Sequence, residues 1–137
     1  MSAPDLFELA SAFLIRLNDH AVARPFLAAY DMRVQFDVTD GDPFHAVIRD
    51  GAVAAVRRGR VDAFSNRDDF EVFGPDDGLR LVFEGRLTPA VAMYYGKLTP
   101  RGERAKHCQA AVVFTLLHQA QQPAYLARPD AASELGL

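Results

Sequence analysis

An α+β fold is predicted for this chain of 137 residues, with antiparallel strands and with helices on one face of the sheet. Apolar residues recur at helical spacing near the N-terminus, the period changes to two over residues 32–55, and helical spacing returns after residue 75. Half of the residues are hydrophobic and 24% are charged, so one domain of this length can bury a core without disulfides or metal. Strands grouped before helices indicate α+β rather than α/β.

The first predicted element is an amphipathic helix over residues 6–17. Apolar residues recur at i, i+3, i+4, i+7, i+8 and i+11 and so lie on one face of the helix. These residues are Leu6, Leu9, Ala10, Phe13, Leu14 and Leu17. Pro4 suits the first helical position, and Asp5 and Glu8 suit the positive end of the helix. Asn18-Asp19 is expected to end this helix, and a short second helix follows Pro25.

Two strands and a hairpin come next. One set of residues is expected in the core, namely Met32, Val34, Phe36 and Val38. The alternating set is expected in solvent, namely Arg33, Gln35 and Asp37. Phe44, Ala46 and Ile48 alternate in the same way, and Asp50-Gly51 is a strong hairpin signal. This turn places Ile48 opposite Val53 and Arg49 opposite Ala52, with Val53 and Ala55 on the buried face.

The middle of the chain is polar and irregular from residue 59 to 69. A strand is predicted at residues 61–64 within it, and a further strand at residues 70–73. Leu79, Val82, Phe83 and Leu87 then follow helical spacing after Gly74-Pro75.

The next elements are short. Thr88-Pro89 is typical of a helix start, and Gly96 is a natural helix terminator. A short strand is predicted over residues 97–99, confined to an edge or ended by Pro100 because proline has no N–H for the sheet. A last helix is predicted over residues 103–119. Residues 1–122 are expected to form the domain, and residues 123–137 a loose tail.

Charge and composition exclude several functions. The net charge of −3 makes nucleic acid a poor partner, and the cluster of Arg57, Arg58 and Arg60 is interpreted as a solvated turn, although it could meet a phosphate or an anionic head group. No apolar run is long enough for a transmembrane helix, and the N-terminus resembles no secretory signal. A lone Cys108 allows no internal disulfide and favours a reducing, cytoplasmic compartment.

No catalytic residue, metal site or cofactor is predicted. The four histidines, His20, His45, His107 and His118, do not stand at metal-ligand spacing. Cys108 lies on the apolar side of its predicted helix without a base, so we interpret it as a small buried hydrophobe.

The most unusual stretch runs from residue 79 to 98, where two short helices carry apolar residues on more than one face. Such helices bury two sides, or bury one side and line a cavity with the other. Spacing alone favours ordinary core packing.

A motif in this stretch resembles sterol carrier protein domains, a family of small lipid binders. The motif comprises Gly85-Arg86-Leu87-Thr88-Pro89, Ala92, Gly96-Lys97-Leu98 and Gly102. The resemblance extends, in order of elements, across residues 5–119. It implies a five-stranded, mainly antiparallel sheet covered by helices around an apolar tunnel. It further implies non-enzymatic binding or transfer of an acyl chain, an isoprenoid or a sterol-like lipid, and allows transient membrane contact. The residues mapped to the tunnel are Phe83, Leu87, Met93, Tyr94, Leu98, Val112 and Leu116.

Two other functions remain open. Similar domains act as accessory or scaffold proteins that present lipid or quinone intermediates to biosynthetic enzymes. A small cone-shaped α+β enzyme would need a polar residue at the base of its pocket, such as His45 or Asp37. Both are expected on the solvent face of the sheet, which disfavours the enzyme.

Overall fold

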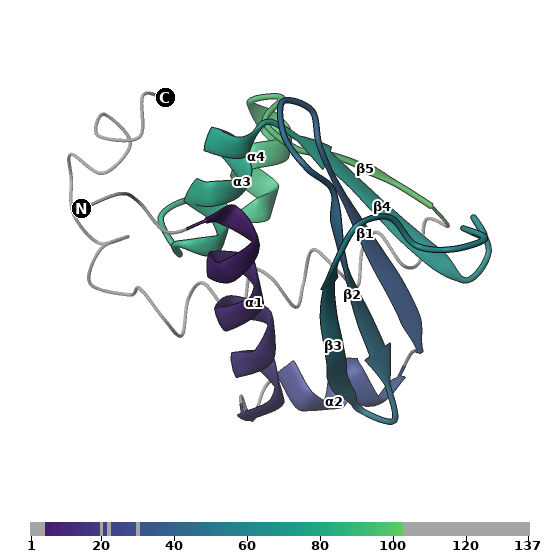
Figure 1. The fold of residues 1–137 in the computed structure, drawn as a ribbon. Helices are drawn as coiled ribbons and strands as arrows, with labels where there is room; N and C mark the ends of the chain where they lie inside the picture. Colours follow the sequence, from purple (N-terminus) through teal and green to yellow (C-terminus); the bar gives the residue numbers. More distant parts are fainter. Residues whose placement is uncertain (1–4, 20, 22, 30, 103–137) are drawn as a thin grey trace.

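A five-stranded sheet with helices on one face organises the molecule (Figure 1). The computed structural model describes residues 5–19, 21, 23–29 and 31–102. The strand order is β3-β2-β1-β4-β5. β1 (Met32–Val38) runs parallel to β4 (Asp69–Gly74), and every other pair of neighbours is antiparallel. The predicted α+β class with a mainly antiparallel, five-stranded sheet is therefore confirmed.

The first helix, α1 (Leu6–Arg16), packs its predicted apolar face against the sheet. Asp5 precedes it as the N-cap, and its Oδ1 accepts a hydrogen bond from the Phe7 N–H at 3.3 Å. A turn of 3-10 helix at Leu17–Asp19 ends it, as Asn18-Asp19 predicts. The second helix, α2 (Ala23–Ala29), begins two residues before Pro25.

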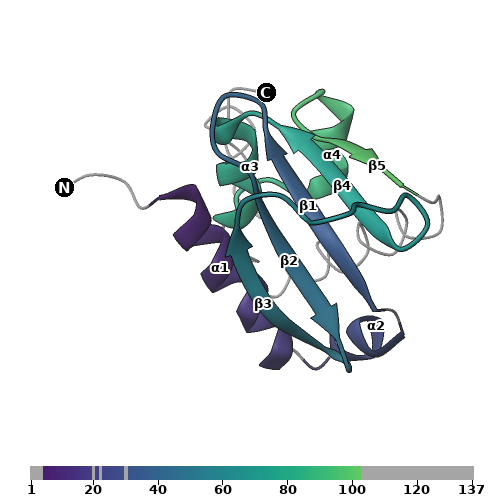
Figure 2. The ribbon, with the colours of Figure 1, turned by 45° about the vertical axis from the view of Figure 1, so that its right-hand side comes forward.

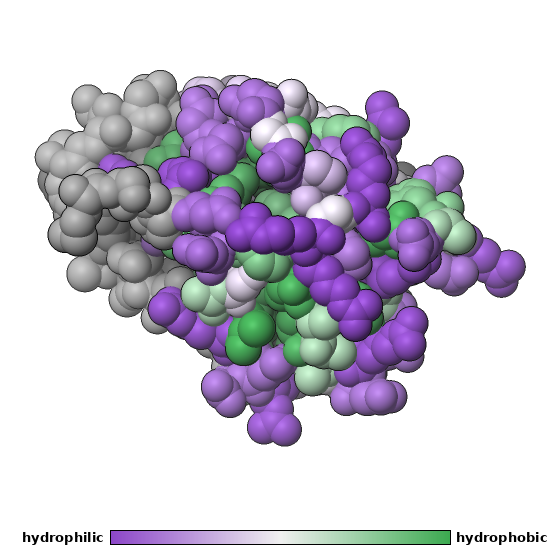
Figure 3. Space-filling model, in the orientation of Figure 1, coloured by the Kyte–Doolittle hydropathy of each residue, from purple (hydrophilic) through white to green (hydrophobic). Residues whose placement is uncertain are grey.

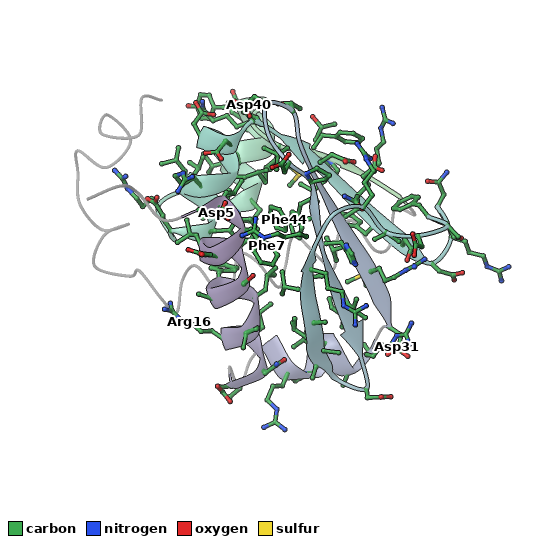
Figure 4. All side chains as sticks on the ribbon, viewed as in Figure 1. Asp5, Phe7, Arg16, Asp31, Asp40 and Phe44 are labelled. Carbon is green, nitrogen blue, oxygen red and sulfur yellow. The ribbon has the colours of Figure 1, made fainter. Side chains whose placement is uncertain are left out.

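The core between helices and sheet is built on stacked and edge-on aromatic rings. Phe36 of β1 stacks on Phe44 of β2, with ring centroids 4.8 Å apart. Phe83 meets the rings of Phe13 and Phe36 edge-on at 5.3 and 5.4 Å. Figure 4 shows Phe44 facing Phe7 of α1 across the gap between helix and sheet, where the two rings meet edge-on at 6.0 Å. The aromatic residues therefore join α1, the two strands and the segment after β4 into one cluster.

The hairpin between β2 (Phe44–Arg49) and β3 (Ala52–Arg58) turns at Asp50-Gly51, as predicted. Ile48 faces Val53 and Arg49 faces Ala52. A bulge after these pairs adds Ala54, so that Ala55 faces Val47 on the outer side of the sheet. The expectation that Ala55 shares the buried face of Ile48 was therefore wrong, because one extra residue reverses the side on which later side chains lie.

The outer face of the sheet is covered, which corrects a second expectation. Val34, Phe36 and Val38 are buried in the core as predicted, and the register is right. Gln35 and Asp37, predicted in solvent, are only 2% and 5% exposed, and Arg33 is half-buried. Figure 2 shows the reason: the connection from β3 to β4 crosses this face of the sheet.

The connection over residues 59–68 is fixed to the sheet by polar contacts. The Val61 N–H donates to Gln35 Oε1 at 2.6 Å. The Arg33 guanidinium forms a two-pronged ion pair with Asp69 at 2.9 and 2.7 Å and donates to the Asp62 carbonyl oxygen. The strand predicted at residues 61–64 is absent from this described segment, where Ala63 has a φ of 48°. The polar side chains of β1 are buried because a distant part of the chain supplies their partners.

The last described elements follow their local signals. α3 (Asp76–Phe83) ends before Gly85, and α4 (Pro89–Tyr94) begins after Thr88, whose Oγ1 accepts a hydrogen bond from the Val91 N–H. Gly96 terminates α4 at a φ of 73°. β5 (Thr99–Arg101) lies at the sheet edge as predicted, but it starts two residues late and includes Pro100. The predictions for residues 103–137, the last helix, Cys108 and the tail, fall outside the described residues.

Candidate apolar ligand site

The residues predicted to line a tunnel differ in their surroundings. Phe83, Leu87 and Leu98 are buried in the main core cluster, and Met93 packs against that cluster while half-buried. Tyr94 is 83% exposed, and its ring meets that of Tyr95 edge-on at 5.1 Å. The structure thus brings four of the five described residues to the helix-covered side of the sheet and turns the fifth outward.

Among the predicted tunnel residues, Phe83 is the one that packs most clearly as an ordinary core side chain. Its ring lies within 5.3–6.2 Å of the rings of Phe13, Phe36 and Phe44. Leu87 and Leu98 are buried in the same cluster but are not part of this group of rings, and Met93 is only half-buried, so these three remain the candidates for contact with a ligand. Val112 and Leu116 lie outside the described residues, and the tunnel as a whole stays a prediction.

The backbone around α3 and α4 is held tightly to the edge of the sheet. The Lys97 N–H donates to the Ala92 carbonyl oxygen at 2.8 Å, which turns the chain from α4 toward β5. Gly74 and Gly78 lie against this turn, and a Cβ on Gly74 would stand 2.5 Å from the Lys97 carbonyl oxygen. The apolar side chains of residues 79–98 are therefore positioned by a close backbone contact between β4 and the approach to β5.

A separate hollow of about 480 Å³ opens beside the start of α1. Its apolar lining includes Leu6, Phe7 and Val38. Asp5 and Arg58 also line it and form an ion pair at 2.6 Å, while the Arg58 guanidinium stacks over the Phe7 ring at 4.3 Å. None of the predicted tunnel residues belongs to this lining, so the hollow is a distinct feature of the helix side.

The two polar residues considered for an enzyme pocket are structural anchors of the outer face. His45 Nδ1 lies 2.9 Å from the Gly59 carbonyl oxygen, and it carries the hydrogen because a carbonyl only accepts. Asp37 Oδ1 lies 2.8 Å from Arg60 Nη1. Both residues are on the outer side as predicted, but both are buried, because the connection that they hold covers them.

A second carboxyl group adjoins Asp37. Burial raises the pKa of Glu71, and the negative charge of Asp37 raises it further. Arg101 and Arg60 oppose the shift. A protonated Glu71 can donate a hydrogen bond to Asp37, whose Oδ1 also lies 2.8 Å from Arg60 Nη1. Sequence spacing did not reveal this pair, because its members belong to different strands.

Asp69 behaves in the opposite way. Burial alone would raise the pKa of Asp69, but the hydrogen bonds from Arg33 and from the Ser65 N–H outweigh burial and hold it below its usual value.

In the described part of the chain, no three His, Cys, Asp or Glu side chains are grouped to hold a metal ion. Within the same residues, no helix is both long and apolar enough to cross a membrane.

Comparisons with solved structures identify the fold. The chain aligns with a crystal structure of sterol carrier protein 2 over 84% of its own length and 95% of that chain, with a TM-score of 0.61 and 20% identity. Palmitated SCP2L2 from Aedes aegypti aligns over 83% and 95%, with a TM-score of 0.56 and 16% identity. The ubiquinone synthesis protein UbiJ-SCP2 aligns over 82% and 87%, with a TM-score of 0.52 and 13% identity. No family model and no curated protein sequence matches the chain.

The fold is thus that of sterol carrier protein 2, which confirms the resemblance based on residues 85–102 at the level of the fold. At 20% identity or less, the likeness does not carry a ligand from one protein to the other.

Proposed function

We propose that this protein binds an apolar ligand, an acyl chain, an isoprenoid or a sterol-like lipid, and carries it without chemical change. The observation that carries this proposal is the alignment with sterol carrier protein 2 over nearly the whole of that chain. The palmitated state of a second neighbour is a further support, since that protein holds a fatty acyl group.

The proposed site lies between the sheet and residues 79–98. Leu87, Met93 and Leu98 would contact the ligand, with Phe83 and Tyr94 at its margins and Val112 and Leu116 closing it. Met93 suits this role because an unbranched thioether adapts to different bound shapes. A ligand buried here gains about 0.8 kcal/mol per CH₂ group before the cost of ordering its chain.

A scaffold role is the second candidate. In that role the domain would present a lipid or quinone intermediate to a biosynthetic enzyme rather than carry it between membranes. The likeness to UbiJ-SCP2, a ubiquinone synthesis protein, favours this alternative. An apolar small molecule is the proposed partner in both roles.

We propose a cytoplasmic location because a single cysteine in 137 residues fits a reducing compartment.

The experiment is a titration of delipidated protein with fluorescent fatty acids of increasing chain length. Affinity should rise with length until the site is full, because each added CH₂ group buries more apolar surface. Met93→Trp should weaken binding by about tenfold or more while leaving most of the fold's stability, because a cavity accepts volume that a packed core would not. Val91→Trp is the matched control, since Val91 lies two residues earlier on α4 and is exposed.

Two results would count against the carrier. One is affinity that does not depend on chain length, and the other is a Met93→Trp variant that unfolds while Val91→Trp does not. Native mass spectrometry of the purified protein should show co-purified lipid. Transfer of a fluorescent lipid between vesicles then separates the two roles, because a carrier accelerates transfer and a scaffold retains its ligand.

A further inference from the structure

The outer face of the sheet carries a hollow of about 550 Å³ beside the connection that crosses it. One row of side chains crosses the three strands β1, β2 and β3 at this hollow. In it Arg33 of β1 faces Val47 of β2, and Val47 faces Ala55 of β3. In another row Arg57 faces His45, and Arg49 lies two residues beyond Val47 along β2. The small apolar floor is thus bordered by arginines on several sides.

The arginines of this hollow are not all neutralised by the protein. Arg33 pairs with Asp69, and Arg60 pairs with Asp37. Arg49 and Arg57 are exposed and form no ion pair within the part of the chain that the structure describes. Arg58 also lines the hollow and pairs with Asp5, and the Asp62 carboxylate adds one negative charge to the lining, which leaves two unpaired arginines against one carboxylate. A positive surplus therefore collects here although the whole chain has a net charge of −3.

Figure 3 shows how hydrophilic and apolar side chains are distributed on one side of the molecule. Strongly hydrophilic side chains gather over the upper end of β3 and the connection that follows it, next to an apolar area lower on the strand. A bound anion would offset the repulsion among the unpaired positive charges that line this hollow. Guanidinium groups match a phosphate group particularly well, since each can donate two parallel hydrogen bonds to its oxygens.

We propose that this hollow binds a phosphate group, with Arg49 and Arg57 as its principal ligands. The group would belong to a small soluble molecule or to a lipid head group. The row of Arg33, Val47 and Ala55 that lines the hollow is on the outer side of the sheet, and Figure 2 shows α1 and α3 on the other side. This site is therefore separate from the proposed apolar site and can exist without it.

The first test is a calorimetric titration with inorganic pyrophosphate at low salt. The double variant Arg49→Gln/Arg57→Gln should weaken binding by about tenfold or more, because both unpaired guanidiniums are lost. Arg57→Lys keeps the charge and should weaken binding by less than Arg57→Gln. Arg16→Gln removes one positive charge, as Arg57→Gln does, and is the matched control for that single variant; Figure 4 shows Arg16 on α1, pointing away from the sheet. Circular dichroism of the variants checks that they fold.

A second arm separates the two sources of phosphate. Vesicles of phosphatidylglycerol are sedimented with the protein, alongside vesicles of phosphatidylcholine. Binding of pyrophosphate without vesicle binding assigns the site to a soluble molecule. Vesicle binding that the double variant loses and Arg16→Gln keeps assigns it to a head group. The proposal is overturned if neither pyrophosphate nor anionic vesicles bind, or if Arg16→Gln weakens binding as much as the double variant.

Discussion

Glu71 illustrates how a single side chain can lower the stability of this fold. Its carboxyl group is partly buried next to Asp37, so ionisation is more costly in the folded state than in the unfolded chain. A pKa raised by folding means that the group favours the folded state at low pH and that this benefit is lost as the pH rises through the folded-state pKa. Arg60 and Arg101 offset only part of this cost.

Replacing Glu71 with glutamine should therefore raise the free energy of unfolding at about pH 7, above the ordinary glutamate value of 4.5, because the raised pKa of Glu71 makes its ionisation costly in the folded state. Glutamine resembles the protonated acid and can still donate a hydrogen bond to Asp37. The gain should vanish below the ordinary glutamate value of 4.5, where the wild-type carboxyl is protonated whether folded or unfolded. Urea unfolding of the two proteins at about pH 7 measures the expected gain in the free energy of unfolding, and the same experiment at about pH 4 tests whether that gain is lost. The exposed Glu8→Gln should show no such gain, and a Glu71→Gln variant less stable than wild type at neutral pH would contradict the argument.

At the scale of the elements, the junction between β4, α3 and β5 depends on two glycines. A Cβ on Gly74 would lie 2.5 Å from the Lys97 carbonyl oxygen, whereas a Cβ on Gly78 would lie 3.1 Å from both Lys97 Cβ and that oxygen. The first distance cannot be kept without moving backbone. The second requires a shift of a few tenths of an ångström.

Gly74→Ala should accordingly cost about 1–3 kcal/mol of stability, in the range of overpacked cores. Gly78→Ala should cost much less, because Gly78 lies within α3 and alanine gains about 1 kcal/mol of helix propensity over glycine. Thermal or urea unfolding of the two variants compares them directly. Equal losses would show that the approach of the Lys97 backbone does not set the cost.

The elements themselves were largely predictable because their signals are local. Alternation defined β1 and β2, Asp50-Gly51 defined the hairpin, and Thr88-Pro89 defined the start of α4. The bulge at Ala54 was not predictable, since it depends on how β3 pairs with β2 rather than on residues within β3. The burial of Gln35 was missed for a related reason: its partner Val61 is 26 residues away, and a polar residue on a strand ordinarily indicates solvent.

At the scale of the whole molecule, one apolar cluster joins the helices to the sheet, and the proposed ligand would have to share that space. The spacing of residues 79–98 could place them on the covered side of the sheet. It could not separate side chains that fill the core from side chains that line a cavity, because both are apolar at the same period. Ring contacts help to make that distinction, and they identify Phe83 among the predicted tunnel residues as a core side chain.

Phe83→Ala in delipidated protein should cost about 3–5 kcal/mol, because it leaves a cavity among three aromatic rings. Against a typical total of about 5–15 kcal/mol, the variant would be marginally stable. Its urea transition should be the same by circular dichroism and by tyrosine fluorescence, since one cluster connects α1, β1 and β2 with Phe83. Ile15→Ala, at a position 51% exposed, should change stability by only about 0.5 kcal/mol. If Phe83→Ala were no more costly than Ile15→Ala, Phe83 would line open space, and the tunnel would extend into the region that these ring contacts assign to the core.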